Sequence, residues 1–99
     1  MYPDHVQIEM PARYSQADAA WIQEQLLLLP PTLRRKIAQR YSEVYDVEFD
    51  AEPVSFRQAN RARHEANTRL RQFVRTHGRA IQGYTSEPPL INAPGVNRA

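Results

Sequence analysis

SFRQANRARHEANTRLRQFVRTHG, residues 55–78, is the stretch on which the fold depends. At about 100° per residue, its apolar side chains fall in one sector of a helical wheel. These residues are Ala59, Ala62, Ala66, Leu70, Phe73 and His77. The opposite sector is basic and holds Arg57, Arg61, His64, Arg71, Arg75 and Arg79. The segment therefore predicts an amphipathic helix with one apolar face and one cationic face.

Boundary signals stand at both ends of this expected helix. Ser55 is followed three residues later by Gln58, which is the pattern of a capping box. Gly78 stands where a left-handed C-cap residue is usually found, because glycine has no Cβ to clash in that conformation. The two signals predict a helix over residues 55–78.

Arginine dominates the charge of this segment. Seven arginines and no lysine lie between Arg57 and Arg79, against a single acid, Glu65. A solvated helix face is one interpretation, although such a face usually mixes charges of both signs. The planar guanidinium can bind a carboxylate or a phosphate through two parallel hydrogen bonds. The pattern therefore favours a face, roughly 27 Å long from Arg57 to Arg75, that meets nucleic-acid phosphate or an acidic groove on a protein.

Length and composition indicate one small domain. The 99 residues are 41% hydrophobic and carry a formal charge of +2. Residues 1–53 hold nine acidic and five basic side chains, whereas residues 54–99 hold eight arginines and two acids. This asymmetry favours contacts between the two halves, an acidic partner for the second half, or both. Because cysteine is absent and the longest apolar run is Leu26–Leu29, we expect no disulfide, no membrane span and a cytoplasmic location.

A second helix is expected over residues 31–51, with a proline in its first turn. Its apolar side chains keep the spacing of a stripe that faces a core. They are Leu33, Ile37, Tyr41, Val44, Tyr45 and Phe49. A short turn at residues 52–54 would fold the arginine-rich helix back antiparallel to it.

The charges of this second helix oppose its dipole. Cations crowd its first half and carboxylates its end, which costs up to about 1 kcal/mol for each exposed end charge. The residues are Arg34, Arg35, Lys36 and Arg40, and then Glu43, Asp46, Glu48 and Asp50. The antiparallel hairpin would offset this cost by bringing Arg57 and Arg61 close to Asp50 and Asp46.

A first helix is expected over residues 15–29, where Ser15 and Asp18 form the pattern of a capping box. Its apolar stripe consists of Ala19, Ile22, Leu26 and Leu29. Trp21 and Leu28 lie well off this stripe. Either the helix is wedged between the other two, or Trp21 and one or two leucines form a surface for a partner.

The sequence predicts an all-α protein. Residues 1–14 are expected as an extended arm, residues 15–79 as the helical domain and residues 80–99 as a flexible tail. The domain is either a small three-helix unit or an open helical hairpin whose first helix packs well only in a complex. The expected core contains Leu33, Ile37, Tyr41, Val44, Ala59, Ala66, Leu70 and Phe73.

The sequence contains no recognisable catalytic constellation. His5, His64 and His77 do not have the i, i+4 spacing of a helical metal site. A glycine-rich phosphate loop and a nucleophile elbow are both absent. We therefore expect a non-enzymatic protein with no metal and no cofactor.

Two functions fit the arginine-rich face. The first is docking on a larger nucleic-acid enzyme, which the neighbouring acidic patch at residues 43–52 favours because it would repel phosphate. The alternative is direct binding of DNA or RNA through the basic helix. In either case the expected partner-binding residues are Arg57, Arg61, Arg71, Arg75, Arg79, Trp21 and Leu28. The oligomeric state is not predicted.

The runs LPPTLRRKIAQRYSEVYD at 29–46 and AEPVSFRQANRARHEANTRLRQFV at 51–74 resemble small accessory proteins of temperate lambdoid phages. Among these, the similarity is greatest to the anti-RecBCD proteins, which bind and modify the host recombination nuclease. It covers about residues 25–76 and rests on phrases such as AEPVSFRQ and RARHEANTRLR. The resemblance implies a non-enzymatic modulator or inhibitor that acts in the host cytoplasm on a RecBCD-like complex. It assigns no binding residue.

Overall fold

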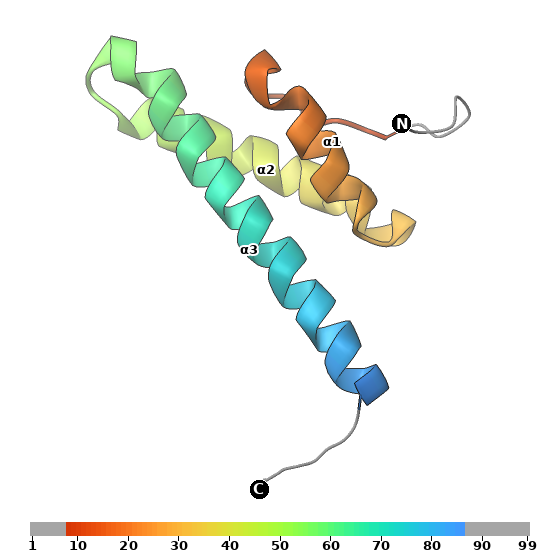
Figure 1. Ribbon diagram of the computed structural model, residues 1–99. Helices are drawn as coiled ribbons and strands as arrows, with labels where there is room; N and C mark the ends of the chain where they lie inside the picture. The colour runs from red at the N-terminus through yellow and green to blue at the C-terminus, as the bar shows by residue number, and fades with distance from the viewer. Residues whose placement is uncertain (1–7, 87–99) are drawn as a thin grey trace, which may run out of the picture.

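Three α-helices make up the described part of the chain (Figure 1). The computed structural model describes residues 8–86, with side chains over residues 8–80. The helices are α1 (Ala19–Leu27), α2 (Pro31–Ala51) and α3 (Gln58–Ser86), with 3₁₀ turns at Gln16–Asp18 and Ser55–Arg57 directly before α1 and α3. The all-α prediction is confirmed over these residues, among which no strand occurs.

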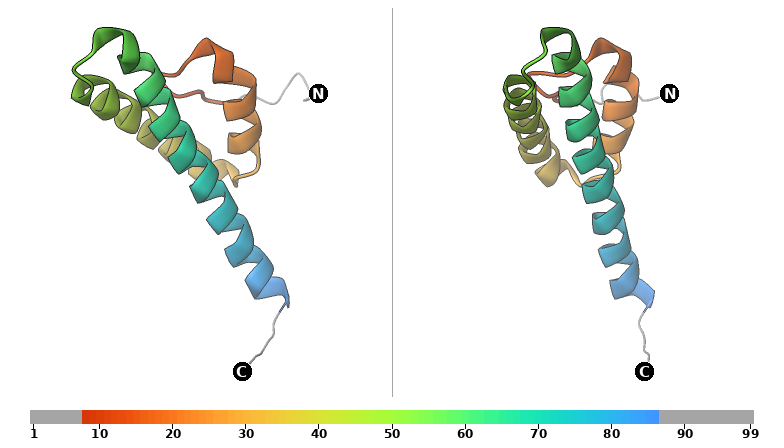
Figure 2. Two further views of the ribbon diagram at one scale, coloured as in Figure 1. Left: turned by 60° about the vertical axis from the view of Figure 1, so that its left-hand side comes forward. Right: turned by 90° about the vertical axis from the view of Figure 1, so that its left-hand side faces the viewer.

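The helices α2 and α3 form an antiparallel hairpin, and α1 packs against both of them (Figure 1). Ile22 and Leu26 of α1 are fully buried, so the fold is a packed three-helix unit rather than an open hairpin. In both views of Figure 2, α3 continues well past the ends of α1 and α2. At about 1.5 Å per residue, its 29 residues span roughly 43 Å.

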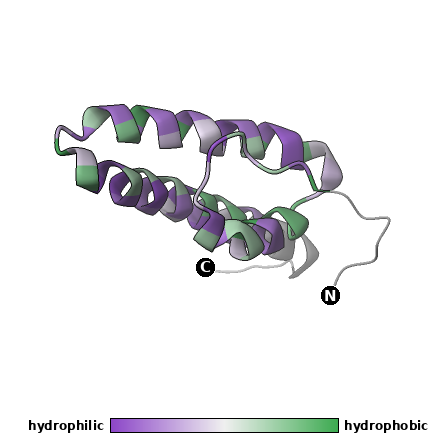
Figure 3. Cartoon of the chain, turned by 90° about the horizontal axis from the view of Figure 1, so that it is seen from above, coloured by the Kyte–Doolittle hydropathy of each residue, from purple (hydrophilic) through white to green (hydrophobic). Residues whose placement is uncertain are grey.

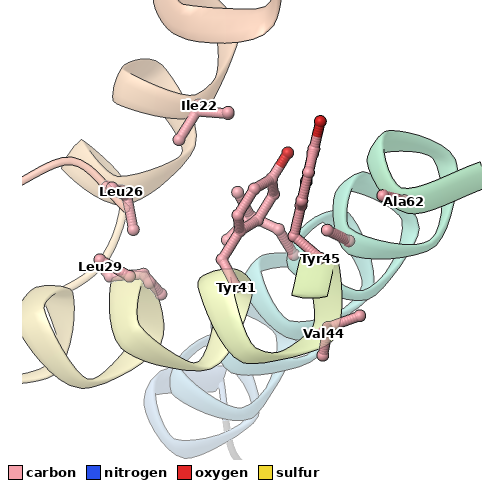
Figure 4. Packing of buried hydrophobic residues seen from close by; sticks show 10 residues of the cluster. Ile22, Leu26, Leu29, Tyr41, Val44, Tyr45 and Ala62 are labelled. Atoms are coloured by element: carbon pink, nitrogen blue, oxygen red, sulfur yellow. The ribbon is translucent and has the colours of Figure 1, made fainter. Parts of the chain in front are cut away.

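The core lies where the three helices meet (Figure 4). It consists of Ile22, Leu26 and Leu29, then Ala38, Tyr41, Val44 and Tyr45, and finally Ala62, Ala66 and Leu70. The alanines on α2 and α3 let the helices approach closely, while the leucines, isoleucine and tyrosines fill the space between them. Full burial of an Ile or Leu side chain contributes about 1.5–3 kcal/mol to stability, so α1 is firmly held.

A hydropathy colouring shows hydrophobic residues spaced between longer hydrophilic stretches on the helices (Figure 3). This is the pattern of amphipathic helices that each bury one face. Within residues 8–86, none of the helices is both long and apolar enough to cross a membrane.

Arg34, in the first turn of α2, caps the end of α1. Its Nε donates to the carbonyl oxygens of Leu26 and Leu29, each at 3.0 Å, and its Nη2 donates to that of Leu27 at 3.3 Å. A guanidinium stabilises the C-terminus of a helix because the last carbonyls lack partners and carry partial negative charge. The charge of Arg34 opposes the dipole of α2, but it stabilises the C-terminal end of α1.

The described part of the predicted arm, residues 8–14, forms neither helix nor strand and packs on α2. The backbone N–H groups of Ala12 and Arg13 donate to the hydroxyl of Ser42, at 2.7 and 3.3 Å. Pro11 is buried beside them. Residues 1–7 of the predicted arm lie outside the described residues.

Two of the predicted core residues are not in the core. Ala59 is exposed, because it lies in the first turn of α3, residues 58–61, which contributes no buried side chain. Phe73 remains 37% exposed at the edge of the α2–α3 contact. Leu33 and Ile37 are partly buried against the core, and the other four predicted residues are buried within it.

The predicted end of the third helix at Gly78 is wrong. Gly78 lies inside α3, which continues to Ser86. A single glycine is a weak stop signal, since it costs at most about 1 kcal/mol in a helix, and the next proline comes only at Pro88. Residues 80–86 of the predicted tail are therefore helical, and residues 87–99 lie outside the described residues.

The two predicted capping boxes are also not formed. Ser15 makes no capping hydrogen bond, and Ser55 lies within a 3₁₀ turn whose N-cap is Val54. The Gln58 side chain instead donates to the carbonyl of Phe49 at the end of α2, at 3.0 Å. The first helix is shorter than predicted as well, because residues 16–18 are 3₁₀ and α1 ends at Leu27.

Candidate docking surfaces on the third helix

One face of α3 is anchored in the domain. Ala62, Ala66 and Leu70 are buried, one turn apart, against α1 and α2. Because 3.6 residues make a turn, this inner face fixes which side chains of α3 point away from the domain. Whether each predicted arginine forms an internal ion pair then depends on which residues lie beside its own turn of the helix.

Arg61 is used within the hairpin. Its Nε donates to Oε1 of Glu48 at 3.1 Å, and its Nη1 lies 3.5 Å from Oε1 of Glu52. The hydrogen bond to Glu48 raises the pKa of the Arg61 guanidinium. The hairpin therefore does pair the arginine-rich helix with the acidic end of α2, as predicted, but through different carboxylates.

Asp46, which was expected to pair with the arginine-rich helix, is instead bound by the N-terminal arm. Nη1 of Arg13 donates to Oδ1 of Asp46 at 2.5 Å. The Arg13 guanidinium also lies 5.1 Å from the centre of the Tyr45 ring and 5.2 Å from that of Phe49. The arm thus neutralises part of the acidic patch that the sequence alone leaves open.

Arg63 belongs to a polar network that ties the three helices together. Its Nε and Nη2 donate to the two carboxylate oxygens of Asp18, at 2.9 and 2.6 Å, and Asn67 donates to the same carboxylate at 3.0 Å. The hydroxyl of Tyr41 on α2 donates in turn to the side-chain amide oxygen, Oδ1, of Asn67. The hydrogen bonds from Arg63 and Asn67 lower the pKa of Asp18, and burial raises the pKa of Tyr41.

Trp21 and Arg71 meet at the surface. The Arg71 guanidinium lies 5.3 Å from the centre of the Trp21 ring, which is the geometry of a cation–π contact. Trp21 is partly buried against the core, so it is not a free surface residue. Leu28, the other predicted contact on this helix, is 67% exposed.

Arg57, Arg75 and Arg79 are exposed. Arg57 lies over the ring of Phe56, with 5.6 Å between the guanidinium and the ring centre. Among the residues whose side chains the structure describes, no carboxylate lies within ion-pair distance of these three arginines or of Arg71. The arginines predicted from the wheel thus separate into one that is paired internally, Arg61, and four that have no such pair among the described residues.

The structure also contains an apolar groove that the sequence did not single out. It has a volume of about 270 Å³ and lies between α2 and α3, with no residue of α1 in its walls. Its lining comprises Ile37, Arg40, Tyr41, Val44, Ala66, Arg69, Leu70 and Phe73. There is little indication of this groove in the sequence, because Phe73 lies on the apolar stripe and is therefore predicted to be a core residue.

Among the described residues, no three His, Asp or Glu side chains are grouped closely enough to share a metal ion. Comparisons of the chain with protein-family models, with curated proteins and with solved structures find no match. The candidate surfaces are therefore defined by their own geometry and charge.

Proposed function

We propose that this chain is a non-enzymatic binding protein that docks through the outer face of α3 on a larger nucleic-acid enzyme in the cytoplasm and modulates it. The observation that carries the proposal is the row Arg71, Arg75 and Arg79. These arginines follow one another at about one turn along α3, and no described carboxylate is within ion-pair distance of them. The planar guanidinium is pre-organised for two parallel hydrogen bonds to a carboxylate or a phosphate, so less side-chain freedom is lost for each hydrogen bond formed.

A protein partner is favoured by the aromatic ring beside this row and by an exposed leucine just after α1. Trp21 lies against the Arg71 guanidinium, and Leu28 is 67% exposed. Arginine and aromatic residues are enriched at protein interfaces and often contribute most of the binding energy. The sequence resemblance makes a host recombination nuclease of the RecBCD type the first partner to test, with this chain as a phage-encoded modulator or inhibitor.

Direct nucleic-acid binding is a second candidate, and one observation favours it. The acidic patch that would repel phosphate is largely used within the chain, because Asp46 pairs with Arg13 and both Glu48 and Glu52 pair with Arg61. A nucleic acid could therefore approach α3 without strong repulsion from the end of α2.

The test replaces the three arginines together, as Arg71→Gln, Arg75→Gln and Arg79→Gln. Since truncation of interface arginines commonly costs about 1–2 kcal/mol or more each, affinity for the nuclease should fall about a hundredfold or more. The effect of the protein on degradation of linear DNA by the nuclease should disappear in parallel. The matched variant carries lysine at the same three positions, which keeps the charge but removes the guanidinium fork.

The outcomes separate the two candidates. With a protein partner whose carboxylates are bound by the fork, the lysine variant should recover only part of the affinity. With naked DNA, lysine should recover most of it. The salt dependence of DNA binding by the glutamine variant should then be shallower by about one unit for each phosphate that it no longer binds. A glutamine variant that binds and acts like the parent would contradict both candidates.

A further inference from the structure

The groove between α2 and α3 lies on a different side of α3 from the arginine row. Leu70 and Phe73 line it, whereas Arg75 and Arg79 point away from it by more than a quarter turn of the helix. What occupies this groove is therefore a separate question from what binds the outer face.

The floor of the groove is apolar and belongs to the core. Tyr41, Val44, Ala66 and Leu70 are all buried members of the core. Phe73 forms part of its rim and is 37% exposed, although the rest of the ring packs at the edge of the helix pair. A preformed apolar floor with a half-exposed aromatic rim is typical of a groove that accepts apolar side chains from a partner.

The rim of the groove is cationic. Arg40 projects from α2 and Arg69 from α3, so one guanidinium flanks each side. A second hollow continues from the groove along α2 and adds Lys36 and Glu43, with Ile37, Arg40 and Phe73 shared between the two. Glu43 is held by Arg40 at 3.1 Å, and no described carboxylate lies within ion-pair distance of Arg69 or Lys36.

We infer that this groove is a docking site for an acidic amphipathic helix of a partner protein. Such a helix would place large apolar side chains at i, i+3 or i+4, and i+7 in the groove. Carboxylates on both sides of that apolar ridge would meet Arg40 and Arg69. The inference does not rest on the proposed function, because it concerns a different surface and different residues.

The positive charge at the rim of the groove favours an acidic helix over a second copy of the chain. In a two-fold dimer through the groove, the same patch would face itself, so Arg40, Arg69 and Lys36 of one copy would face the same set of cations on the other. Like charges brought together across an interface disfavour binding. An acidic helix, in contrast, turns the same three cations into favourable contacts.

The experiment uses the full-length chain and three labelled synthetic peptides of about 16 residues. The first is an amphipathic helix with leucines and a phenylalanine on one face and glutamates on both flanks. The second replaces the glutamates with lysines, and the third replaces the apolar residues with serines. Fluorescence anisotropy gives the affinities, and amide chemical shifts of the isotope-labelled protein locate the site.

The glutamate peptide should bind at least about tenfold more tightly than either of the others. Its shift changes should centre on residues 37–44 and 66–73. The double variant Arg40→Glu, Arg69→Glu should weaken binding about tenfold or more, and Phe73→Ala should weaken it too. The matched double variant Arg75→Glu, Arg79→Glu changes the net charge equally but lies outside the groove, so at about 150 mM salt it should weaken binding clearly less than the groove variant does.

Three results would overturn the inference. One is failure of the glutamate peptide to bind, or equal binding of the lysine peptide. Another is equal loss of affinity in the two double variants, which would indicate general attraction to a basic protein. The third is a dimer in analytical ultracentrifugation that dissociates in the Phe73→Ala variant, because the groove would then be filled by a second copy.

Discussion

The early and late turns of α3 carry similar arginines but use them differently. Arg61 and Arg63 bind carboxylates of α2 and of the 3₁₀ turn before α1. Arg75 and Arg79 lie further along the same helix, beyond Leu70, the last buried side chain of α3 among the described residues, and no described carboxylate is within ion-pair distance of them. The difference comes from the elements packed beside each turn and not from the residue type.

This comparison separates arginines that hold the fold from arginines that are available to a partner. Arg61 and Arg63 would have to break pairs with Glu48 and Asp18, whose side chains are only 17% and 13% exposed, so they add little to docking. Arg40 differs from them, because its pair with Glu43 is exposed on both sides and is easily exchanged for a carboxylate of a partner. An arginine whose guanidinium contacts only solvent breaks no internal ion pair when it binds a partner. The later turns of α3 are therefore the part of the helix on which binding experiments should concentrate.

The largest expected effect tests where the core ends along α3. Leu70 is 3% exposed and Phe73, three residues later, is 37% exposed. Leu70→Ala should lower the free energy of unfolding by about 2–4 kcal/mol, because it removes buried methyl groups and leaves a cavity. Phe73→Ala should cost only about 1–2 kcal/mol, since part of that ring already contacts water. Urea denaturation followed by circular dichroism measures both.

Equal losses for the two variants would contradict this boundary. They would mean that Phe73 is as deeply buried as the helical wheel suggested, and that the groove on its side is closed. Val74→Ala serves as a control at the same turn, because Val74 is partly buried against the core and lies on the opposite flank of the inner face.

A smaller effect is expected at Asp18, which tests the claim that Arg63 holds the fold. Asp18→Asn should lower the free energy of unfolding by about 1–2 kcal/mol near neutral pH, since it removes the charge bound by Arg63 and Asn67. The comparison variant Arg71→Ala loses only its interaction with Trp21 and should cost under about 1 kcal/mol. Urea denaturation of both variants measures the difference.

The pH dependence of Asp18→Asn has a definite sign. The native state lowers the pKa of Asp18 below its ordinary value of 3.8. The stabilisation is therefore complete above that value and is lost as the pH falls through the lowered pKa. The stability gap between parent and variant should thus be full at about pH 7 and shrink below about pH 4. A gap that stays constant down to about pH 2 would show that the Asp18 carboxylate contributes nothing through its charge.

Much of the fold could be predicted from local patterns. The bounds of α2 follow from two prolines and an apolar stripe, and they match the structure from Pro31 to Ala51. Helical turns begin at Gln16 and Ser55, close to the predicted starts, but the predicted capping hydrogen bonds are not formed, because Asp18 and Gln58 bind other partners. A local cap competes with every tertiary partner that folding brings near, and single-sequence patterns do not contain those partners.

The candidate site was predictable only as a set of positions. The wheel correctly placed Arg61, Arg75 and Arg79 on the outer side of α3, but it could not tell which of them meets Glu48. That distinction needs the crossing of α2 and α3 and the path of the chain before α1. The groove was missed for the same reason, since the apolar pattern of Phe73 fits both a core residue and a rim residue.

The smallest expected effect concerns Gly78 and decides whether the late turns of α3 are helical at all. Within a helix, glycine is about 0.5–1 kcal/mol less favourable than alanine, because its backbone loses more freedom. A Cβ placed on Gly78 would meet no atom within 4 Å. Gly78→Ala should therefore raise the free energy of unfolding by up to about 1 kcal/mol and slightly increase the helical signal in circular dichroism.

If residue 78 were instead the left-handed C-cap that the sequence suggested, the same substitution would be destabilising, because alanine tolerates that conformation poorly. The sign of the change thus separates the two structures. Gly78→Pro completes the test, since a proline here should reduce helicity while leaving the core around Leu70 intact.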